Sequence, residues 1–491
     1  MSTKLSLGNL DALPAGIATP KYDRGALKAG IVHIGLGNFH RAHQAVYLDD
    51  LFGSGRDHDW AIIGAGVRDA DRVVREKLGQ QDWLTTVVER EAAGSKARVI
   101  GPHVDFIQPG DVAATLDVLS RPEIRIVSLT ITEGGYYISP ATQEFDSAHA
   151  DILFDAKHID APKTVFGLIV AGLVRRRAAG IAPFTVMSCD NIPGNGHVCE
   201  NAVAGLAELV DPELARWIRA DVAFPNSMVD RITPATTDRE RATLLDKFGL
   251  QDNWPVFCEE FRQWVLEDKF PAGRPALEKV GVTFTSDVAP YELMKIRILN
   301  GGHAAISYPA ALLDIHFVHQ AMADPQIAAY LERLTEREII PVVPPPPGVD
   351  LGDYQRLIAR RFTNPMIEDT IPRLCFDGSN RQPKFILPTA VDRLKSGATV
   401  NGLALVSALW CRYCHGETES GKTIAPNDPN WDRLQTAAKL ARANPAAFLA
   451  MKDIFGEAAG NPVYVAAFSD ALSKLWAHGV RATLTDYLAG A

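Results

Sequence analysis

The most constraining feature of the sequence is a change of pattern near residue 290. From about residue 29 to 290, short β-branched apolar runs alternate with helical patterns, which predicts βαβ units and a mostly parallel sheet. Beyond that point, Ala- and Leu-rich stretches with helical periodicity replace them. We therefore predict a doubly wound α/β domain over residues 1–288 and a mostly α-helical C-terminal domain over residues 289–491. The expected strands are 31–34, 60–67, 124–131 and 184–188, and the expected helices are 291–316, 325–338, 353–361, 402–415, 431–455 and 463–488.

Length and charge narrow the class of protein. A chain of 491 residues exceeds the roughly 250–300 residues at which one hydrophobic core stops growing, which favours two domains. The formal net charge of −9 argues against a nucleic-acid partner, because phosphate backbones are held by clustered Lys and Arg. The sequence shows no secretory signal and no run of about 18 apolar residues. We expect no membrane partner and a cytoplasmic location.

The six cysteines are too sparse for a disulfide scaffold. Cys411-Arg-Tyr-Cys414-His415 matches the C-x-x-C-H pattern of covalent haem attachment. The preceding residues 403–410 have the pattern of a buried helix, which argues against haem. Zinc is not favoured either, because no second ligand pair lies at a suitable spacing.

A glycine-rich loop, residues 35–43 (GLGNFHRAH), follows the first expected strand. Gly35 and Gly37 place backbone N–H groups and a helix N-terminus where a pyrophosphate can bind. His40 replaces the third glycine of the common fingerprint, so we expect this helix to stand slightly further from the strand. A tight strand–helix turn without a ligand is the alternative. The expected cofactor contacts in this loop are Gly35, Gly37, Asn38, Phe39 and, as a cation for phosphate, Arg41.

Two further stretches favour a dinucleotide. Asp69 follows the second expected strand, and its carboxylate can bind the adenosine ribose hydroxyls and repel a 2′-phosphate, which favours NAD. It lies 32 residues beyond Gly37 instead of about 20, which requires an enlarged first crossover, and the adjacent Arg68 leaves NADP open. Thr132 and Glu133 follow a later strand, where ligands of doubly wound sheets collect.

The segment 290–307 carries four polar residues in an apolar helical pattern. At roughly 100° per residue, with Lys295 at 0°, Glu292 lies near about 60°, His303 near about 80° and Asn300 near about 140°. A solvated face is one explanation. The apolar neighbours indicate burial instead, and buried polar groups need partners such as a polar ligand. Burial lowers the pKa of a lysine and makes its amine a possible proton acceptor.

Tyr291 and Lys295 also match the tyrosine–lysine pair of the short-chain dehydrogenases, in which the tyrosine is the acid–base group. Those enzymes are single domains of about half this length with a different glycine loop. We therefore assign the base to Lys295.

Five segments together resemble the mannitol dehydrogenase family, the polyol-specific long-chain dehydrogenases. They are residues 35–43 (GLGNFHRAH), 130–136 (TITEGGY), 189–191 (CDN), 224–234 (FPNSMVDRITP) and 295–303 (KIRILNGGH). The resemblance covers nearly the whole chain, and 224–234 is its most specific part.

The resemblance implies a Rossmann-type NAD-binding domain, a helical substrate domain and metal-independent hydride transfer between NAD and a polyol. It implies Lys295 as general base, Asn191 and Asn300 as donors to the alkoxide, His303 and Asp230 as orienting groups, and Arg373 and Lys384 as contacts to distal hydroxyls. We add the hypothesis that Glu292 relays protons from Lys295 to solvent.

Several alternatives stay open. The first expectation is interconversion of D-mannitol and D-fructose, followed by a D-arabinitol 4-dehydrogenase or a hexuronate reductase of the same family. A uronate would need an extra cation, for which Arg373, Arg381 and Lys384 are candidates. Asp230 and Arg231 could also form an ordinary ion pair. A non-catalytic NAD-binding sensor would not need the buried lysine and its amide donors. The resemblance favours a monomer.

Overall fold

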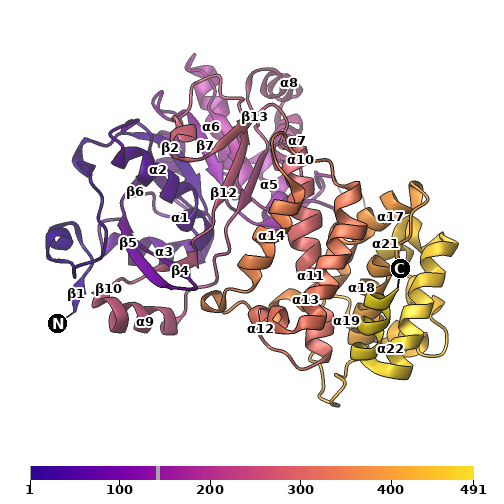
Figure 1. Ribbon diagram of the computed structural model, residues 1–491. Coiled ribbons are helices and arrows are strands. Elements are labelled where there is room, and N and C mark those ends of the chain that lie inside the picture. Colours follow the sequence, from indigo (N-terminus) through magenta and orange to yellow (C-terminus); the bar gives the residue numbers. More distant parts are fainter. Residues whose placement is uncertain (1, 140–143, 491) are drawn as a thin grey trace. The chain divides into compact units, whose positions relative to one another are not determined.

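A computed structural model describes residues 2–139 and 144–490. The chain forms two compact units, Met1–Ala289 and Pro290–Ala491. The predicted class is confirmed, because the first unit is built around a parallel sheet and the second is largely helical (Figure 1).

The central sheet of the first unit has five parallel strands in the order β6-β3-β2-β7-β8. The strand order reverses between β2 and β7, and in such sheets a ligand binds at the carboxyl ends of the strands beside this reversal. The four expected strands are all present. The bounds are β2 (Ala29–Ile34), β3 (Ala61–Ala65), β6 (His103–Phe106), β7 (Ile126–Leu129) and β8 (Thr185–Ser188).

Helices cover both faces of this sheet, as expected for a doubly wound fold. Val32, Val127 and Val186 pack on one face against apolar residues of α4 (Val112–Leu119), α6 (Val165–Ala178) and α7 (Asn195–Val210). Ile31, Ile62, Ile126 and Met187 pack on the other face against α2 (Gln44–Gly53). Both faces of the strands are therefore buried, which explains their nearly continuous apolar sequences. The remaining helices of the unit are α1 (Asn38–Ala42), α3 (Asp69–Gly79), α5 (Ala150–Lys157), α8 (Pro212–Asp221) and α9 (Asp238–Phe248).

The enlarged first crossover is confirmed. Two helices, α1 and α2, lie between β2 and β3, and the chain breaks between them at His43 (φ −121°, ψ −90°). This extra helix accounts for the distance in sequence between the glycine loop and Asp69.

Smaller sheets of the first unit were not predicted. β4 pairs with β5 as an antiparallel hairpin and with β11 in parallel, and β12 pairs with β9 and β13. Only the β4–β5 hairpin is local, whereas the β4–β11 and β9–β12 pairings join strands that are further apart in sequence. Charged residues such as Glu89 and Arg90 also interrupt the apolar pattern. The bounds are β1 (Thr3–Lys4), β4 (Thr85–Glu91), β5 (Gly94–Ile100), β9 (Ser227–Asp230), β10 (Leu250–Gln251), β11 (Val256–Glu259), β12 (Gln263–Glu267) and β13 (Thr283–Thr285).

Each predicted stretch of the second unit contains helix, but four of them differ from the prediction, and helices over 318–323, 371–375, 378–385 and 387–395 were not predicted. The stretch 325–338 is an α-helix that continues into a π-helix from Thr335. The first stretch contains a π-helix, η5 (Lys295–Asn300), between α10 (Ala289–Met294) and α11 (Gly301–Leu312). The stretch 431–455 is three helices, α19 (Trp431–Ala441), α20 (Ala446–Leu449) and α21 (Lys452–Phe455). The last helix, α22 (Pro462–Ala489), is interrupted at Gly479, where φ is 78°.

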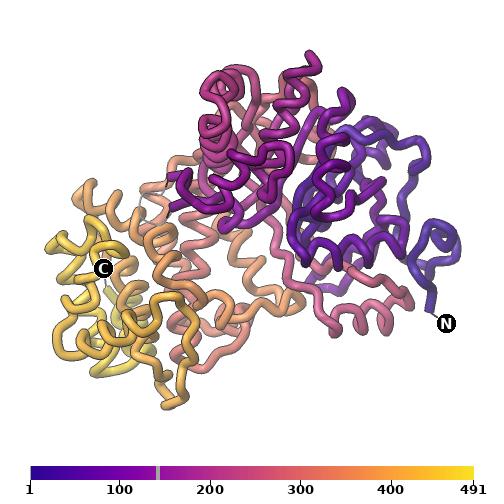
Figure 2. Tube along the Cα trace, turned by 180° about the vertical axis from the view of Figure 1, so that it is seen from behind, coloured from indigo at the N-terminus to yellow at the C-terminus, as the bar shows by residue number. Residues whose placement is uncertain are grey.

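The remaining helices of this unit include α18, the long buried helix of the C-terminal half. α18 carries Cys411 and Cys414 in its buried interior, where they are free thiols and serve packing. α18 packs along α22, which Figure 2 shows at the C-terminal end of the chain. The bounds are α12 (Val318–Ala323), α13 (Pro325–Leu334), η6 (a π-helix, Thr335–Ile339), α14 (Leu351–Phe362), α15 (Ile371–Cys375), α16 (Gly378–Phe385), α17 (Leu387–Lys395) and α18 (Asn401–Cys414).

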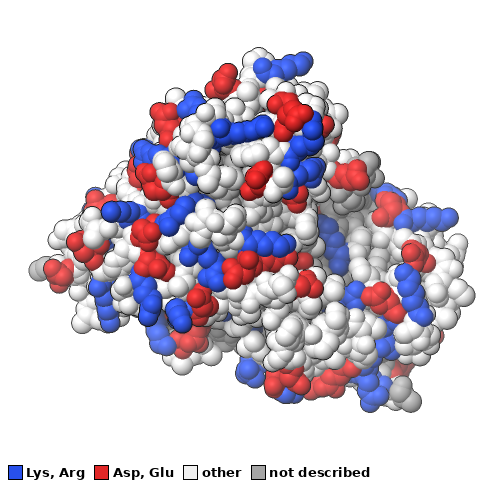
Figure 3. Space-filling view, turned by 90° about the horizontal axis from the view of Figure 1, so that it is seen from above, with Lys and Arg blue, Asp and Glu red and all other residues white. Residues whose placement is uncertain are grey.

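Within residues 2–139 and 144–490, no helix is both long and apolar enough to cross a membrane. On the face shown in Figure 3, Lys and Arg side chains are interspersed with Asp and Glu.

Candidate functional site

The predicted site residues fall in both units. In the first unit, the glycine loop follows β2. Gly35 has φ 100°, and a Cβ on it would lie 2.2 Å from the carbonyl oxygen of Thr130, so the protein itself requires glycine here. Gly37 differs, because a Cβ there would meet nothing nearer than 3.9 Å and its φ of −73° suits any residue. The space beside Gly37 fits the close approach of a ligand.

His40 stacks on His33 of β2, with ring centroids 3.4 Å apart, and its Nε2 lies 2.9 Å from Nε2 of His103. The imidazole of His40 thus lies between the helix and the strand. A glycine at this position would let the two pack more closely. Burial lowers the pKa of His33 to about 3 and holds the pKa values of His40 and His103 well below the ordinary range. All three rings are neutral at physiological pH.

Arg41 is fully buried, which changes its expected role. Its guanidinium donates to the carbonyl of Trp254 and, at 2.7 Å, to Oδ1 of Asn38. Asn38 in turn donates to Pro234 O (3.2 Å) and Thr236 Oγ1 (3.0 Å). Arg41 therefore fixes the loop from behind, and this packing favours an indirect role over the expected phosphate contact. Phe39 stacks on His43 in the same loop.

Asp69 is the first residue of α3, and its side chain is fully exposed, 3.4 Å from Nε of Arg72. The nearby Asp71 is buried instead, and its carboxylate accepts the N–H groups of Val67 and Arg68. Asp71 therefore holds the loop after β3. The exposed carboxylate of Asp69 is accessible to a ligand.

Thr132 and Glu133 are exposed after β7, at the predicted position. Thr132 has φ 65° and ψ 165°, a conformation that is strained for a residue with a Cβ. The buried carboxylate of Asp190 holds it there, accepting the N–H groups of Ile131 and Thr132 (both 2.9 Å) and the Tyr136 hydroxyl (2.8 Å). Burial raises the pKa of Asp190, although these hydrogen bonds oppose the shift. The sequence reasoning missed Asp190, whose only signal was its place in the CDN segment.

Asn191 is exposed, immediately beyond Asp190 and the end of β8. Asp230 is the last residue of β9 and is buried. The adjacent Arg231 donates to Oε1 of Glu89 at 2.6 Å and to two backbone carbonyls, so its charge is paired with Glu89.

In the second unit, Lys295 and Asn300 begin and end the π-helix η5. The expected uniform spacing of 100° per residue is wrong here, because a π-helix closes its hydrogen bonds over five residues instead of four. Gly301 N bonds to Ile296 O in this pattern. A residue five positions further on therefore returns close to the same face, which brings Asn300 nearer to the face of Lys295 than an α-helix would. Lys295 is buried, and Glu292 and Asn300 are partly exposed.

His303, on α11, stacks on Phe362 with ring centroids 4.1 Å apart. Its Nε2 is buried and has no hydrogen-bond partner among the described residues. Burial lowers the pKa of His303 to about 3, so the neutral ring offers this nitrogen to a ligand.

Arg373 is half exposed on α15 and bonds to Asp369 through both Nε (2.6 Å) and a terminal nitrogen (2.5 Å). Burial acts against the charged form of Asp369, but the Arg373 interactions outweigh it and hold its pKa below the ordinary value. Lys384 is exposed on α16, which packs against η5. Among the described residues there is no group of three or more His, Cys, Asp and Glu side chains arranged to hold a metal ion.

Two family models match the chain. Residues 29–279 match the mannitol dehydrogenase Rossmann domain, and residues 287–476 match the mannitol dehydrogenase C-terminal domain. The mannitol 2-dehydrogenase of Cereibacter sphaeroides is 59% identical over 474 residues, which is 96% of this chain and 99% of that protein. The mannitol 2-dehydrogenase of Aspergillus fumigatus is 40% identical over 497 residues, covering 99% of each chain.

Two solved structures share the fold along the whole chain. Pseudomonas fluorescens mannitol 2-dehydrogenase, in a ternary complex with NAD and D-mannitol, has a TM-score of 0.88 and 45% identity, covering 99% of each chain. A D-sorbitol dehydrogenase in substrate-free form has a TM-score of 0.90 and 36% identity, covering 98% of this chain and 100% of that one. With both domain models matched and identity this high, the chain belongs to the mannitol dehydrogenase family.

Proposed function

We propose that this protein is an NAD-dependent polyol dehydrogenase that interconverts D-mannitol and D-fructose without a metal ion. The observation that carries the proposal is the 59% identity, over 96% of the chain, to a mannitol 2-dehydrogenase. The structural relative that binds NAD and D-mannitol supports the same cofactor and substrate.

The first unit, residues 1–288, is proposed to bind the cofactor. The residues fit NAD, since Gly37 leaves room for a pyrophosphate and the exposed Asp69 carboxylate can accept hydrogen bonds from ribose hydroxyls. The strained turn at Thr132 and Glu133 lies beside the strand reversal, where the nicotinamide side of the cofactor is expected. Bound by these residues, NAD would supply the hydride acceptor for oxidation of the carbinol carbon.

Residues 289–491 are proposed to carry the general base. Hydride leaves a carbinol carbon only as its hydroxyl proton is removed, so a base and hydrogen-bond donors must act on the same oxygen. Lys295 is proposed to accept the proton as a neutral amine, a form that its burial favours. The amides of Asn300 and, from the first unit, Asn191 are proposed to stabilise the developing alkoxide. Loss of one such donor typically costs about 10²–10³ in rate.

Four residues are proposed to position the substrate. Neutral His303 presents a nitrogen that no described residue hydrogen-bonds, and Arg373 is fixed by its two bonds to Asp369. We assign His303 and Asp230 to orienting the reacting end, and Arg373 and Lys384 to the distal hydroxyls.

Glu292 is proposed to relay the proton from Lys295 to solvent, because it is partly exposed one helical turn before the lysine. A Glu292→Ala enzyme should show a changed pH–rate profile and solvent isotope effect. If both are unchanged, the relay is wrong.

The function is tested by NADH absorbance with D-mannitol, D-sorbitol, D-arabinitol and D-fructose, each with and without a chelator. The proposal expects the highest kcat/KM on mannitol and fructose and no effect of the chelator. Preference for arabinitol or a hexuronate would favour the other activities of the family, and no turnover on any substrate would favour an NAD-binding sensor.

Lys295→Ala and Tyr291→Phe separate the two candidate bases. We expect Lys295→Ala to abolish hydride transfer, with a loss of at least about 10²–10⁴ in kcat, and Tyr291→Phe to keep most of it. The reverse result would assign the base to the tyrosine.

A further inference from the structure

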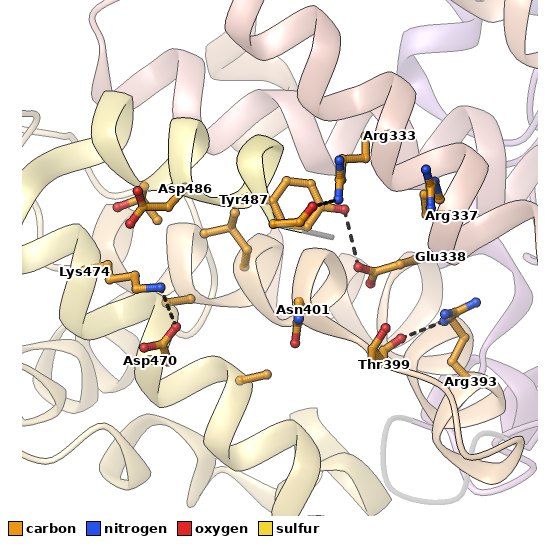
Figure 4. A pocket seen from close by; sticks show the side chains of 15 residues that line it. Arg333, Arg337, Glu338, Arg393, Thr399, Asn401, Asp470, Lys474, Asp486 and Tyr487 are labelled. Carbon is orange, nitrogen blue, oxygen red and sulfur yellow. Dashed lines mark hydrogen bonds and ion pairs between the residues drawn. The ribbon is translucent and has the colours of Figure 1, made fainter.

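The second unit contains a cavity of about 420 Å³ that none of the proposed catalytic or substrate-binding residues line. It is formed by η6, the N-terminus of α18, the end of α17 and the two halves of α22 (Figure 4). Small-molecule sites typically have volumes of roughly 300–1,000 Å³. The cavity is therefore large enough for a ligand of sugar size.

Charged side chains dominate the lining. Arg333, Arg337 and Arg393 lie at one end in Figure 4, together with Glu338, and Lys474, Asp470 and Asp486 lie at the other. The polar groups Thr399, Asn401 and Tyr487 also line it. Four cations thus face three carboxylates, and the arginines are segregated from two of those carboxylates.

One carboxylate at each end of the cavity already has partners. Glu338 is buried and accepts the N–H groups of Gly402 (2.6 Å) and Leu403 (3.0 Å). Burial raises the pKa of Glu338, and these hydrogen bonds oppose that shift. Asp470 lies 3.0 Å from Nζ of Lys474.

Two of the three arginines, Arg337 and Arg393, keep guanidinium nitrogens that have no partner among the described residues. Arg393 is 8% exposed, and only its Nε has a hydrogen-bond partner among the described residues, the carbonyl of Thr399 at 2.8 Å. Arg337 is exposed and has no hydrogen bond or ion pair to any described side chain or backbone group. Arg333, by contrast, donates to the carbonyls of Leu488 and Gly490. The terminal nitrogens of Arg393 and the guanidinium of Arg337 can therefore donate hydrogen bonds to a ligand in the cavity.

We propose that this cavity binds a small phosphate monoester that carries hydroxyl groups, such as a hexitol phosphate. The free donors of Arg337 and Arg393 match a phosphoryl group in charge and in geometry, because phosphate carries about −1.5 to −2 charges and accepts bidentate hydrogen bonds from arginine. Partners for the hydroxyl groups are offered by three other lining residues, Asn401, Asp470 and Lys474.

The cavity is connected to the proposed base within the same unit. The wall that carries Arg337 is η6, which packs against η5, the π-helix of Lys295. Arg297 of η5 is also ion-paired at 2.5 Å with Asp392, the neighbour of Arg393 in α17, and donates to Val342 O at 2.8 Å. Occupancy of the cavity should therefore change the kinetic constants of the enzyme. This kinetic effect rests on the proposed function, whereas binding does not.

Binding is tested by calorimetry with a hexitol phosphate, inorganic phosphate, a hexonate and the free hexitol, all in the presence of saturating NAD and D-mannitol. We expect the hexitol phosphate to bind with one site per chain, inorganic phosphate to bind more weakly, and the hexonate and free hexitol to bind at least about tenfold more weakly than the ester. Tighter binding of the hexonate would overturn the choice of phosphate. Loss of hexitol phosphate binding when NAD and mannitol are present would place it at the substrate site and overturn the proposal.

Arg337→Gln should weaken hexitol phosphate binding by about tenfold or more, the usual effect of losing a charge-assisted hydrogen bond. Arg393→Gln should also weaken hexitol phosphate binding, and circular dichroism checks that this variant is folded. If it is unstable, the result of Arg337→Gln decides, because Arg337 is exposed. Lys439→Gln removes a charge from an exposed position on α19 outside the cavity and should leave binding unchanged. Equal affinities for wild type and Arg337→Gln, or no binding to wild type, would refute the site.

Discussion

Acidification should destabilise the first unit, because four histidines are buried there in neutral form. His33, His40, His43 and His103 are each at most 1% exposed. Three of them form the stack beneath the glycine loop, and His43 marks the break between α1 and α2. In the unfolded chain each would titrate near its ordinary pKa of about 6.5.

The size of the effect follows from the shifted values. Burial lowers the pKa of both His33 and His43 to about 3. Because the folded pKa lies below the unfolded one, this stabilisation is complete above about pH 6.5 and is lost as the pH falls. At about pH 5 the unfolded state gains about 2 kcal/mol per histidine, so these two alone cost about 4 kcal/mol. His40 and His103 act in the same direction, and whole domains are stable by only about 5–15 kcal/mol.

The assay is urea unfolding followed by circular dichroism at about pH 7.5 and about pH 5. His43→Gln, which can keep the bond that His43 Nε2 makes to Gln263 O at 2.9 Å, should reduce the loss between the two pH values by about 2 kcal/mol. His197→Gln is the matched control, since the His197 side chain is 66% exposed and should not alter the loss. An unfolding free energy that is equal at both pH values, or a His43→Gln variant with the wild-type pH dependence, would refute the reasoning.

Three further predictions concern the proposed site. Gly37→Ala should keep the wild-type melting temperature but raise KM for NAD about tenfold or more. Gly35→Ala should lower the free energy of unfolding by at least about 2 kcal/mol, because its Cβ would overlap a carbonyl oxygen. Equal melting temperatures for the two variants would contradict this prediction. Asp69→Asn should lower the ratio of kcat/KM for NAD over NADP by about tenfold or more, and an unchanged ratio would remove Asp69 from cofactor selection. Arg373→Leu should raise the pKa of Asp369 and should raise KM for the polyol more than it lowers kcat. The pH profiles of kcat and KM measure both effects. An unchanged KM would count against a substrate contact by Arg373.

The sequence alone determined the features that depend on local patterns. Four strands of the central sheet, the change to helices near residue 290 and the glycine loop each have a short-range signature of apolar periodicity or turn residues. The long-range pairings of the small sheets have none. β4 pairs with β11 about 170 residues further along the chain, and neither strand indicates its partner in sequence.

Tertiary structure decided what individual site residues do. Arg41 had the chemistry of a phosphate ligand, yet packing turned it toward the carbonyl of Trp254 and toward Asn38. Asp190 had no sequence signal beyond its place in the CDN segment. Its carboxylate holds the strained turn at Thr132 because β7 and β8 end side by side. The π-helix at Lys295–Asn300 was equally hidden, because the helical repeat depends on which backbone hydrogen bonds close, and neighbouring helices settle that choice. A sequence specifies which chemical groups are available, whereas the direction in which a buried group points depends on partners that only the folded chain brings together.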